Sequence, residues 1–350
     1  IKAKRKILFI CGSLNQTTML HQVSGFFSGE EVYFSPYYAD GVEGALAKTG
    51  VLDFSILGGK FRRTTMEYLQ DHKVRIDEKG KQNKYDMVFT CSDLIMPTNI
   101  MGTRIVLVQE GMTDPENLSY HLVRFLRLPR YLASTATTGL SDLYDIFCVA
   151  SEGYKDKFVN KGVKPEKVRV TGIPNFDDIA KYNINSFPHK GFCLVATSDA
   201  RETYKLENRK AFIREALSLS EGKQMIFKLH PNERFDRAIR EIKEIIPDAI
   251  VFTSGNINEM IANCDILVTK YSTVVYVGLA LGKKCYSYFN LEELKKLVPV
   301  QNGATSAANI AREATELLNK QDYTPTTQRN LPPSMVFRKI TQHILGRAGS

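Results

Sequence analysis

The sequence has 350 residues, of which 43% are hydrophobic, enough for a large core, and its length favours two domains. No apolar stretch reaches the roughly 18 residues of a membrane-spanning helix. Basic residues outnumber acidic ones by 47 to 38, which indicates either a well-solvated basic surface or a polyanionic partner such as a nucleotide, an anionic membrane or an acidic glycan. No recognition-helix, RNP or OB-type motif accompanies this charge, so we do not expect nucleic acid as the partner.

The N-terminal run KILFIC is predicted to be a buried first strand. Basic residues precede it, as in a signal peptide, but the run is short and no small-residue cleavage site follows. The next residues, GSLNQTT, are typical of a strand-to-helix loop. The six cysteines form no CxxC pair, and several lie in or beside apolar runs. This pattern indicates reduced, buried thiols in a cytosolic protein rather than a disulfide framework or a zinc site.

Apolar strand-like runs alternate with helical patterns along the whole chain, which is typical of parallel α/β sheets. The first series of strands is KILFIC, YDMVFTCS, RIVLVQEG, YDIFCVAS and VRVTGIP, and the second is GFCLVATS, QMIFKLHP, AIVFTS, DILVTKYS and KCYSYF. A stretch with prolines and asparagines, 174–191, separates the two series. We therefore predict two doubly wound parallel-sheet domains, at 1–180 and 181–330, with a C-terminal helix at 331–350 that packs back on the first.

One segment, 116–134, breaks this rhythm, because it mixes leucines and aromatic residues with Arg124, Arg127 and Arg130. Two interpretations are open. The slightly favoured one is a helix that packs its apolar face on the core. The other is a basic amphipathic segment that lies on an anionic membrane.

Two strand-end loops in the first series carry candidate residues. Gly12 and Ser13 form a turn between a strand and a helix, where backbone N–H groups offer an anion site. The loop has neither the GxGxxG spacing of a dinucleotide fold nor the GK[ST] of a P-loop. Glu110 follows the strand RIVLV, where a shielded carboxylate can act as a general base. On position alone, a turn or helix-capping glutamate is the more common case.

In the second series, the loop VATSDARETY places hydroxyl groups and an arginine after a strand. Ser198 and Arg201 suit a phosphate, since a guanidinium binds phosphate through two parallel hydrogen bonds. Asp199 would repel an anionic ligand unless it takes part in the chemistry, and its alternative role is the N-cap of the next helix.

The stretch MIFKLHPNERF ends a strand with a histidine and a proline. Pro231 lacks an N–H and ends the strand, and it keeps the preceding residue extended. His230 is therefore predicted at a fixed point on the carboxyl edge of the sheet, and Lys228 points to the same strand face. Ligands of open parallel sheets bind at this edge.

The last loop, in DILVTKYSTVVYVGLALGKK, places Tyr271, Ser272 and Thr273 between a strand and an apolar helix. Hydroxyl groups at a helix N-terminus favour a phosphate. A simple Ser/Thr cap is the alternative. The presence of His230 on another strand of the same domain favours a phosphate site formed by both loops.

KLHPNE followed by ANCDILVTKYSTVVYVGLALGKK resembles the C-terminal half of GT-B-fold transferases that build bacterial surface polymers. CDP-glycerol glycerophosphotransferases and Kdo- and sialic-acid-type transferases both pair a His-Pro motif with a Ser/Thr-rich motif that holds the phosphate of a cytidine nucleotide. The resemblance implies two Rossmann-like domains that face a cleft, with donor binding by His230, Lys228, Pro231 and the loop at 271–273. The stretch VRVTGIPNFD is similar to the end of the first domain in this superfamily and in UDP-GlcNAc 2-epimerases.

VLVQEG looks like the motif that supplies the catalytic carboxylate in the sialic-acid-type enzymes, which implies a catalytic role for Glu110. The leading hypothesis is a glycosyltransferase that uses a cytidine-activated sugar, such as CMP-Kdo, to extend lipopolysaccharide or capsule. Asp199 would be a nucleophile or cation stabiliser if the reaction retains configuration. We expect no metal cofactor, because no DxD-type acidic pair lies beside KLHP or YST.

Three alternatives remain at this stage. A CDP-polyol phosphotransferase would share the phosphate site but needs a histidine base, and the sequence has His121 but no Trp-His-Gly motif. A UDP-GlcNAc 2-epimerase would carry a Ser-Gly-Gly helix entry, where this chain has YSTVVY. A nucleotide-binding protein without turnover is the third. The expected partners are a nucleotide-sugar donor and a glycan or glycolipid acceptor, and the expected location is the cytoplasm, with a peripheral contact to the anionic inner membrane.

Overall fold

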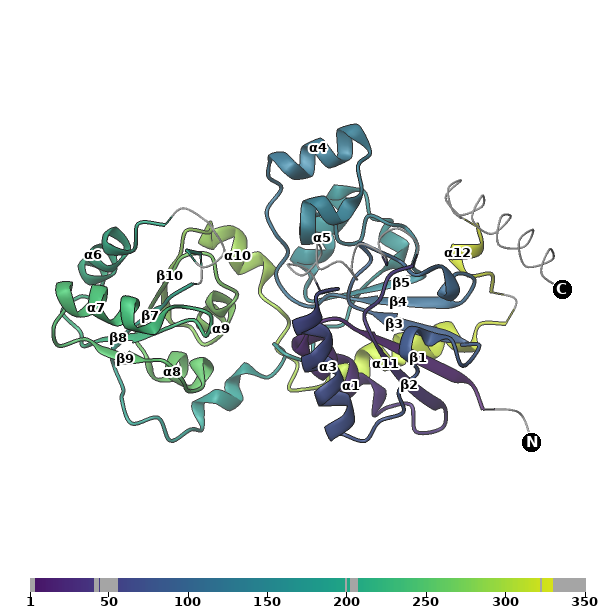
Figure 1. The fold of residues 1–350 in the computed structure, drawn as a ribbon, viewed down its shortest axis with the longest axis horizontal. Coiled ribbons are helices and arrows are strands. Elements are labelled where there is room, and N and C mark those ends of the chain that lie inside the picture. Colours follow the sequence, from purple (N-terminus) through teal and green to yellow (C-terminus); the bar gives the residue numbers. More distant parts are fainter. Residues whose placement is uncertain are drawn as a thin grey trace. The chain divides into compact units, whose positions relative to one another are not determined.

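The computed structural model describes residues 4–40, 44, 56–198, 200–201, 207–321 and 323–329. The chain forms two compact units (Figure 1). Unit 1 comprises Ile1–Asn175 and Asn302–Ser350, and unit 2 comprises Phe176–Gln301. The chain leaves unit 1 inside the predicted linker, but its return at Asn302 differs from the expected division, which kept 181–330 together. The expected helix at 331–350 lies outside the described residues.

Unit 1 contains a six-stranded parallel sheet with the strand order β2-β1-β3-β4-β5-β6. Its strands are β1 (Lys6–Cys11), β2 (Glu31–Pro36), β3 (Met87–Thr90), β4 (Arg104–Val108), β5 (Ile146–Val149) and β6 (Val168–Val170). The chain order reverses between β1 and β3, and such a switch point is where ligands bind in open α/β sheets. The predicted strands of the first series are confirmed, whereas β2 was not predicted.

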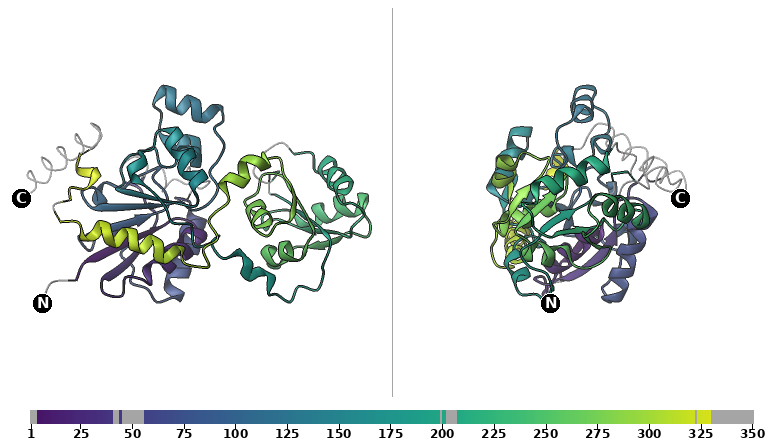
Figure 2. Two further views of the ribbon diagram at one scale, coloured as in Figure 1. Left: turned by 180° about the vertical axis from the view of Figure 1, so that it is seen from behind. Right: turned by 90° about the vertical axis from the view of Figure 1, so that its left-hand side faces the viewer.

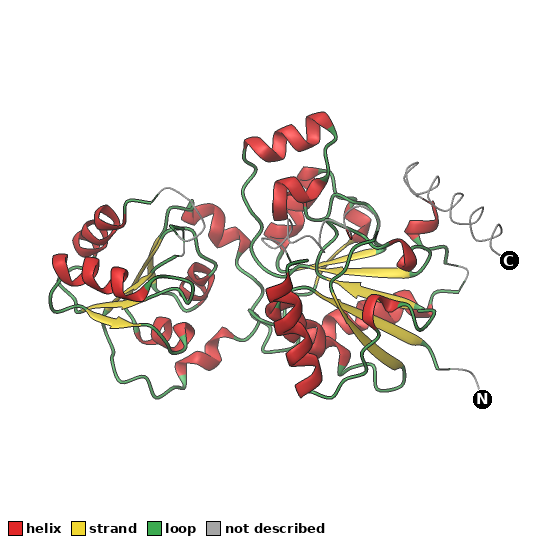
Figure 3. Cartoon of the chain, viewed as in Figure 1, coloured by secondary structure: helices red, strands yellow, loops and turns green. Residues whose placement is uncertain are grey.

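Helices and short 3₁₀ turns connect these strands in the described part of unit 1, and two more helices follow the chain's return at Asn302 (Figure 3). They are α1 (Leu14–Ser24), α3 (Gly59–Asp71), η1 (Glu78–Gly80), η2 (Thr98–Ile100), α4 (Leu118–Leu126), η3 (Arg130–Thr137), α5 (Glu152–Lys161), η4 (Pro165–Lys167), α11 (Ser306–Asn319) and α12 (Thr326–Arg329). Capping sets several of the helix ends. The side chain of Ser151 accepts a hydrogen bond at the start of α5, and Gly162 ends that helix in the left-handed conformation, with φ of 109°.

The main core of unit 1 lies between the sheet and the helices α1 and α11. Figure 2 shows α11 running along the sheet, although it is more than 130 residues away from the last strand in sequence. Ile310, Ala314 and Leu317 of α11 are buried in the same apolar cluster as Met19 and Leu20 of α1. The helix α11 is thus an integral part of the first unit.

Unit 2 contains a five-stranded parallel sheet with the strand order β11-β10-β7-β8-β9. Its strands are β7 (Cys193–Ala196), β8 (Met225–Lys228), β9 (Ile250–Phe252), β10 (Ile266–Thr269) and β11 (Lys284–Tyr286). The other elements are η5 (Ile179–Asn183), α6 (Arg209–Leu219), α7 (Phe235–Ile245), α8 (Ile257–Asn263), α9 (Val274–Ala280) and α10 (Leu291–Leu297). The predicted second series of strands is confirmed, and here the order reverses between β7 and β10.

Two further expectations concern the whole chain. All six cysteines are buried free thiols, as predicted. Within the described ranges, every helix is too short or too polar to cross a bilayer.

Candidate functional site

Three candidate loops of unit 2 lie side by side at the carboxyl edge of its sheet. Ala196, at the end of β7, is in register with Lys228 of β8 on one side and with Thr269 of β10 on the other. Because all three strands are parallel, the loops that follow them emerge at the same edge. The sheet therefore brings the loops that begin at Thr197, Leu229 and Lys270 together at the switch point of unit 2.

The loop that carries His230 is fixed by a carboxylate three residues further on. The backbone N–H of His230 donates to Oε1 of Glu233 at 2.9 Å and to Oγ1 of Thr197 at 3.2 Å. The N–H of Glu233 donates back to the carbonyl of His230 at 3.0 Å, which closes a turn with Pro231 at its second position. The HPNE motif thus holds the histidine backbone from both sides.

The imidazole of His230 is partly exposed and has a defined tautomer when neutral. The N–H of Asn232 lies 3.3 Å from Nδ1 of His230, so Nδ1 is the acceptor. The proton of the neutral ring is then on Nε2, which is the nitrogen that can donate to a ligand oxygen. This is the donor expected of a residue that binds a phosphate.

A buried network of ion pairs stabilises this loop. Glu233 lies 2.9 Å from Arg209, the first residue of α6, and Arg209 also lies 2.7 Å from Glu207. The side chains of all three are no more than 2% exposed. Arg209 donates to the carbonyl of Ser198 at 2.8 Å, which ties the β7 loop to the same network. Nζ of Lys270 lies 3.6 Å from the same oxygen of Glu207, Oε1, so all three loops are linked through charged side chains.

Lys228 does not extend its charge toward the edge of the site. It is 8% exposed, and its Nζ donates to the backbone carbonyl of Leu229 at 2.9 Å. Burial lowers the pKa of this ammonium group. Lys228 therefore contributes to the stability of the strand end in this structure, and its predicted contact with a donor phosphate stays a prediction.

Ser272 and Thr273 immediately precede α9, as predicted. Thr273 is the N-cap residue, and its side chain makes no capping hydrogen bond. Oγ of Ser272 accepts a long hydrogen bond, of 3.4 Å, from the N–H of Val274. Tyr271 is 64% exposed, and its ring makes edge contacts with Tyr288 and Phe289. Hydroxyl groups and an exposed aromatic ring thus follow β10.

The β7 loop is described only in part. Asp199 lies outside the described residues. Ser198 is partly buried, with its Oγ 3.4 Å from Glu207. The guanidinium of Arg201 pairs with Glu241 of α7 at 2.9 Å. A phosphate clamp by Arg201 would have to compete with this ion pair, and that role stays a prediction.

In unit 1, Glu110 is held by the loop between β1 and α1. Ser13 Oγ donates to Oε1 of Glu110 at 2.7 Å, Asn15 Nδ2 to the same oxygen at 3.3 Å, and Gln16 Nε2 to Oε2 at 2.6 Å. Ser13 is also the N-cap of α1, so the carboxylate lies at the positive end of that helix. The side chain of Ser13 therefore contacts the protein's own carboxylate, while the N–H of Gly12 donates to Oε1 of Gln16 at 3.0 Å. The predicted binding of a ligand anion by the backbone of this loop stays a prediction.

The position of Glu110 is fixed from the strand side as well. The preceding residue, Gln109, is 1% exposed, accepts from the N–H of Ala150 at 2.9 Å and donates to the carbonyl of Gly111 at 2.7 Å. A carboxylate offers about four lone-pair positions. The described hydrogen bonds occupy three of them, two on Oε1 and one on Oε2. The catalytic role of Glu110 stays a prediction.

Several residues of these sites were not predicted from the sequence. Gln16 and Asn15 contact Glu110 from almost a hundred positions away, and only the fold could reveal them. Asn175 of the GIPN stretch donates to the backbone carbonyl of Asn15 at 3.2 Å, which gives that motif a place beside the same loop. Glu233 had a local signal, since a glutamate three residues after a turn start commonly caps a backbone N–H.

No protein-family model matches the sequence, and no curated protein matches it significantly. Solved structures show the fold instead. The chain is similar to UDP-GlcNAc 2-epimerase from Neisseria meningitidis bound to UDP-GlcNAc, with a TM-score of 0.52 and 14% identity over 90% of this chain and 100% of that chain. A putative UDP-N-acetylglucosamine 2-epimerase from Listeria monocytogenes gives a TM-score of 0.52 and 13% identity over 98% of both chains.

The wall teichoic acid polymerase TagF, in a variant soaked with CDPG, gives a TM-score of 0.50 and 10% identity over 91% of this chain and 90% of that chain. These neighbours, together with the two parallel α/β sheets, show that the chain has the two-domain, Rossmann-like GT-B fold. At such low identity they show the fold alone.

Proposed function

We propose that the chain is a GT-B glycosyltransferase that moves a sugar from a nucleotide-activated donor to a glycan or glycolipid acceptor. A cytidine donor such as CMP-Kdo and a lipopolysaccharide or capsule acceptor are the preferred substrates, as the sequence resemblance implies. The observation that carries the proposal is the meeting of the His-Pro loop and the Ser/Thr-rich loop at the switch point of the unit 2 sheet.

In this proposal unit 2 binds the phosphate of the donor. Nε2–H of His230 donates to a phosphate oxygen, and the hydroxyl groups of Ser272 and Thr273 take other oxygens. The Glu233 carboxylate holds the His230 backbone, so the imidazole is placed before the donor arrives, which reduces the entropy lost on binding. The exposed Tyr271 ring offers an apolar face for the nucleoside.

Glu110 of unit 1 is the proposed general base. The acceptor hydroxyl oxygen forms a bond with the anomeric carbon of the donor sugar, and the bond from that carbon to the phosphate oxygen breaks. Glu110 accepts the hydroxyl proton, and the nucleotide leaves with the bonding electrons on its phosphate. Hydrogen bonds from Ser13, Asn15 and Gln16 orient the carboxylate for this step. Asp199 is the proposed nucleophile or cation stabiliser for a retaining reaction.

A second candidate, a CDP-polyol phosphotransferase, is supported by the fold likeness to TagF. It requires a histidine base, and His121 lies exposed on α4, with its ring 5.2 Å from that of Tyr120. We prefer Glu110 because three side chains donate hydrogen bonds to its carboxylate, whereas His121 has only an aromatic neighbour among the described contacts. The UDP-GlcNAc 2-epimerase alternative has the support of several fold neighbours and lacks the expected Ser-Gly-Gly helix entry.

The test is incubation of the purified chain with CMP-Kdo, CDP-glycerol and UDP-GlcNAc, with the released nucleotide and the sugar product followed by chromatography. Release of CMP and Kdo from CMP-Kdo supports the proposal. Release of CMP and glycerol phosphate from CDP-glycerol alone would favour the phosphotransferase, and conversion of UDP-GlcNAc to its 2-epimer would favour the epimerase. We also propose that turnover needs no metal, so EDTA should leave the rate unchanged. Loss of activity in EDTA that magnesium restores would contradict this.

A further inference from the structure

The helix α4 presents an uncovered apolar face. We define the α4 outer face as Leu118, Leu122, Phe125 and Leu126, which recur at the spacing of one side of a helix. Leu118 is 74% exposed and Phe125 is 86% exposed. Of the thirteen exposed large apolar side chains in the described residues, six lie between Leu118 and Leu132. Such a concentration on one segment marks an interaction surface, unlike single exposed leucines.

The opposite side of α4 is firmly attached to unit 1. Tyr120 and Val123 are buried against Ala133 and Ala136, which belong to η3. Nζ of Lys161, on α5, lies 5.4 Å from the centre of the Tyr120 ring. Figure 1 shows α4 at the rim of unit 1, away from the strands. The helix is therefore held by its inner side, and the exposure of its outer face does not result from a missing core contact.

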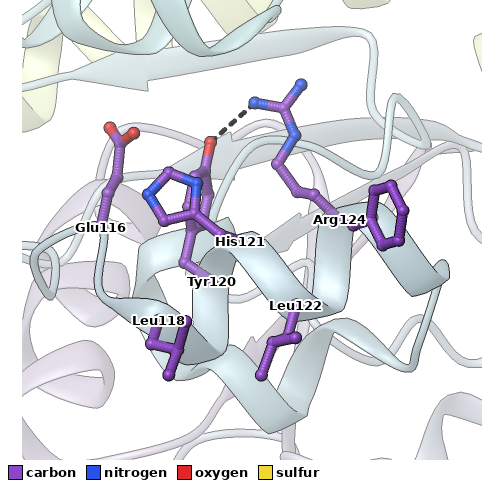
Figure 4. Close-up of a pocket in the computed structure, with 7 residues that line it drawn as sticks. Glu116, Leu118, Tyr120, His121, Leu122 and Arg124 are labelled. Carbon is purple, nitrogen blue, oxygen red and sulfur yellow. Dashed lines mark hydrogen bonds between the residues drawn. The ribbon is translucent and has the colours of Figure 1, made fainter.

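Basic side chains accompany this face. The stretch from Leu118 to Leu128 contains His121, Arg124 and Arg127 and no acidic residue. Arg124 donates to the hydroxyl of Tyr120 at 2.8 Å, as Figure 4 shows, and Leu118 and Leu122 project from the other side of the helix. Glu116 is the nearest acidic group before the helix, and it lies 3.5 Å from the ammonium group of Lys161. The segment that carries the apolar face thus has a net positive charge.

We propose that the α4 outer face inserts into the interfacial region of an anionic lipid bilayer. Leucine and phenylalanine side chains enter the acyl boundary, while the guanidinium groups of Arg124 and Arg127 meet headgroup phosphates. This occupant satisfies both the apolar and the cationic groups, and the net charge of +9 of the whole chain adds long-range attraction. The proposal is independent of the proposed reaction, because it concerns binding alone.

A second copy of the chain fits this face less well. In a two-fold symmetric contact the same patch meets itself, so arginines would face arginines with no acidic residue between Leu118 and Leu128 to pair with them. Like charges across an interface oppose association. The charge pattern therefore selects a negatively charged occupant.

The test is co-sedimentation of the full chain with vesicles of phosphatidylcholine alone or with 30% phosphatidylglycerol. We expect binding to the anionic vesicles that weakens with salt. The double substitution Leu122→Ser and Phe125→Ser should reduce the partition coefficient at least about tenfold, since burial of each side chain is worth about one to two orders of magnitude. Arg127→Gln should reduce binding to the anionic vesicles by about fivefold.

The matched control is Ile184→Ser, because Ile184 is 91% exposed but lies in unit 2. This variant should bind vesicles as the unsubstituted chain does. Thermal melting should be unchanged in all variants, since each altered side chain is exposed. Absence of binding to the anionic vesicles at millimolar lipid, or equal binding by the double variant, would overturn the proposal. A dimer in analytical ultracentrifugation that the double variant abolishes, without vesicle binding, would overturn it in favour of a second copy.

Discussion

Replacement of Glu233 by glutamine tests how the His230 loop is held. The carboxylate is 1% exposed, pairs with Arg209 at 2.9 Å and accepts from the N–H of His230 at 2.9 Å. Glutamine has almost the same volume, but it removes the negative charge and replaces one acceptor oxygen with an NH₂ group. That NH₂ group must face either the N–H of His230 or the guanidinium of Arg209, and both are donors.

The size of the effect follows from the remaining partners. Removal of one member of a buried ion pair costs about 3–5 kcal/mol. Arg209 keeps Glu207 at 2.7 Å, so we expect the lower end, about 3 kcal/mol. For a unit of this size, that corresponds to a fall in melting temperature of roughly 6–12 °C. The affinity for CMP should fall as well, by at least about tenfold, because the imidazole loses its backbone anchor.

Differential scanning calorimetry measures the melting temperature, and titration calorimetry with CMP, at a temperature where the variant is folded, measures the affinity. Lys210→Gln is the matched control, because Lys210 is the next residue of α6 and forms an exposed ion pair with Glu244 at 2.7 Å. It should leave both quantities unchanged, since exposed pairs contribute little. A Glu233→Gln variant that melts like the unsubstituted chain would refute the buried network. A variant that melts early but binds CMP normally would refute the positioning of His230.

Three further outcomes are expected. His230→Ala should leave the melting temperature unchanged and weaken CMP binding by about 10- to 150-fold, because it removes a charge-assisted hydrogen bond. Ser272→Ala should cause a smaller loss of affinity. Unchanged affinity in calorimetry would remove His230 from the site. Glu110→Gln should keep nucleotide affinity and lower turnover by roughly 10²–10⁴, and normal turnover in a steady-state assay would rule it out as the base. Burial raises the pKa of Cys11 to about 12 and likewise raises the pKa of the other thiols, so all six should resist DTNB at pH 8 in the folded chain and react in guanidinium; rapid labelling of the folded chain would contradict this. Because the unfolded thiols ionise near their ordinary pKa of 9 while the folded ones stay protonated, this contribution to stability is present below pH 9 and declines as the pH rises above it.

Local patterns in the sequence were sufficient to predict the strand ends of the site. An apolar run followed by His230 and Pro231 predicts a strand that ends there, and the alternation of strands with helices implies a common carboxyl edge. The contacts made across the fold had no such pattern. Gln16 meets Glu110 only because β1 and β4 belong to one sheet with a single strand between them. The strand β2 was missed because EVYFSP is mixed in polarity, and the sheet supplies its order through pairing with β1.

The chain's return at Asn302 differed from prediction for a similar reason. The helical pattern of α11 shows an apolar side but not the sheet that it covers. Its docking is set by details that sequence patterns do not reveal, such as Gly172, whose φ of 73° lets the chain pass close to Ser306. A Cβ at that position would lie 2.3 Å from Oγ of Ser306, so no other residue fits without movement.

The interrupted course of unit 1 also orders the events of its synthesis. Unit 2 is an uninterrupted stretch, whose two ends are tied by a hydrogen bond from Gln301 to the carbonyl of Phe176, so it can fold as soon as it leaves the ribosome. Unit 1 has to wait, because the apolar side of α1 stays open until α11 has been translated. A chain released before Asn302 would therefore expose this surface to chaperones and proteases although its second unit is complete.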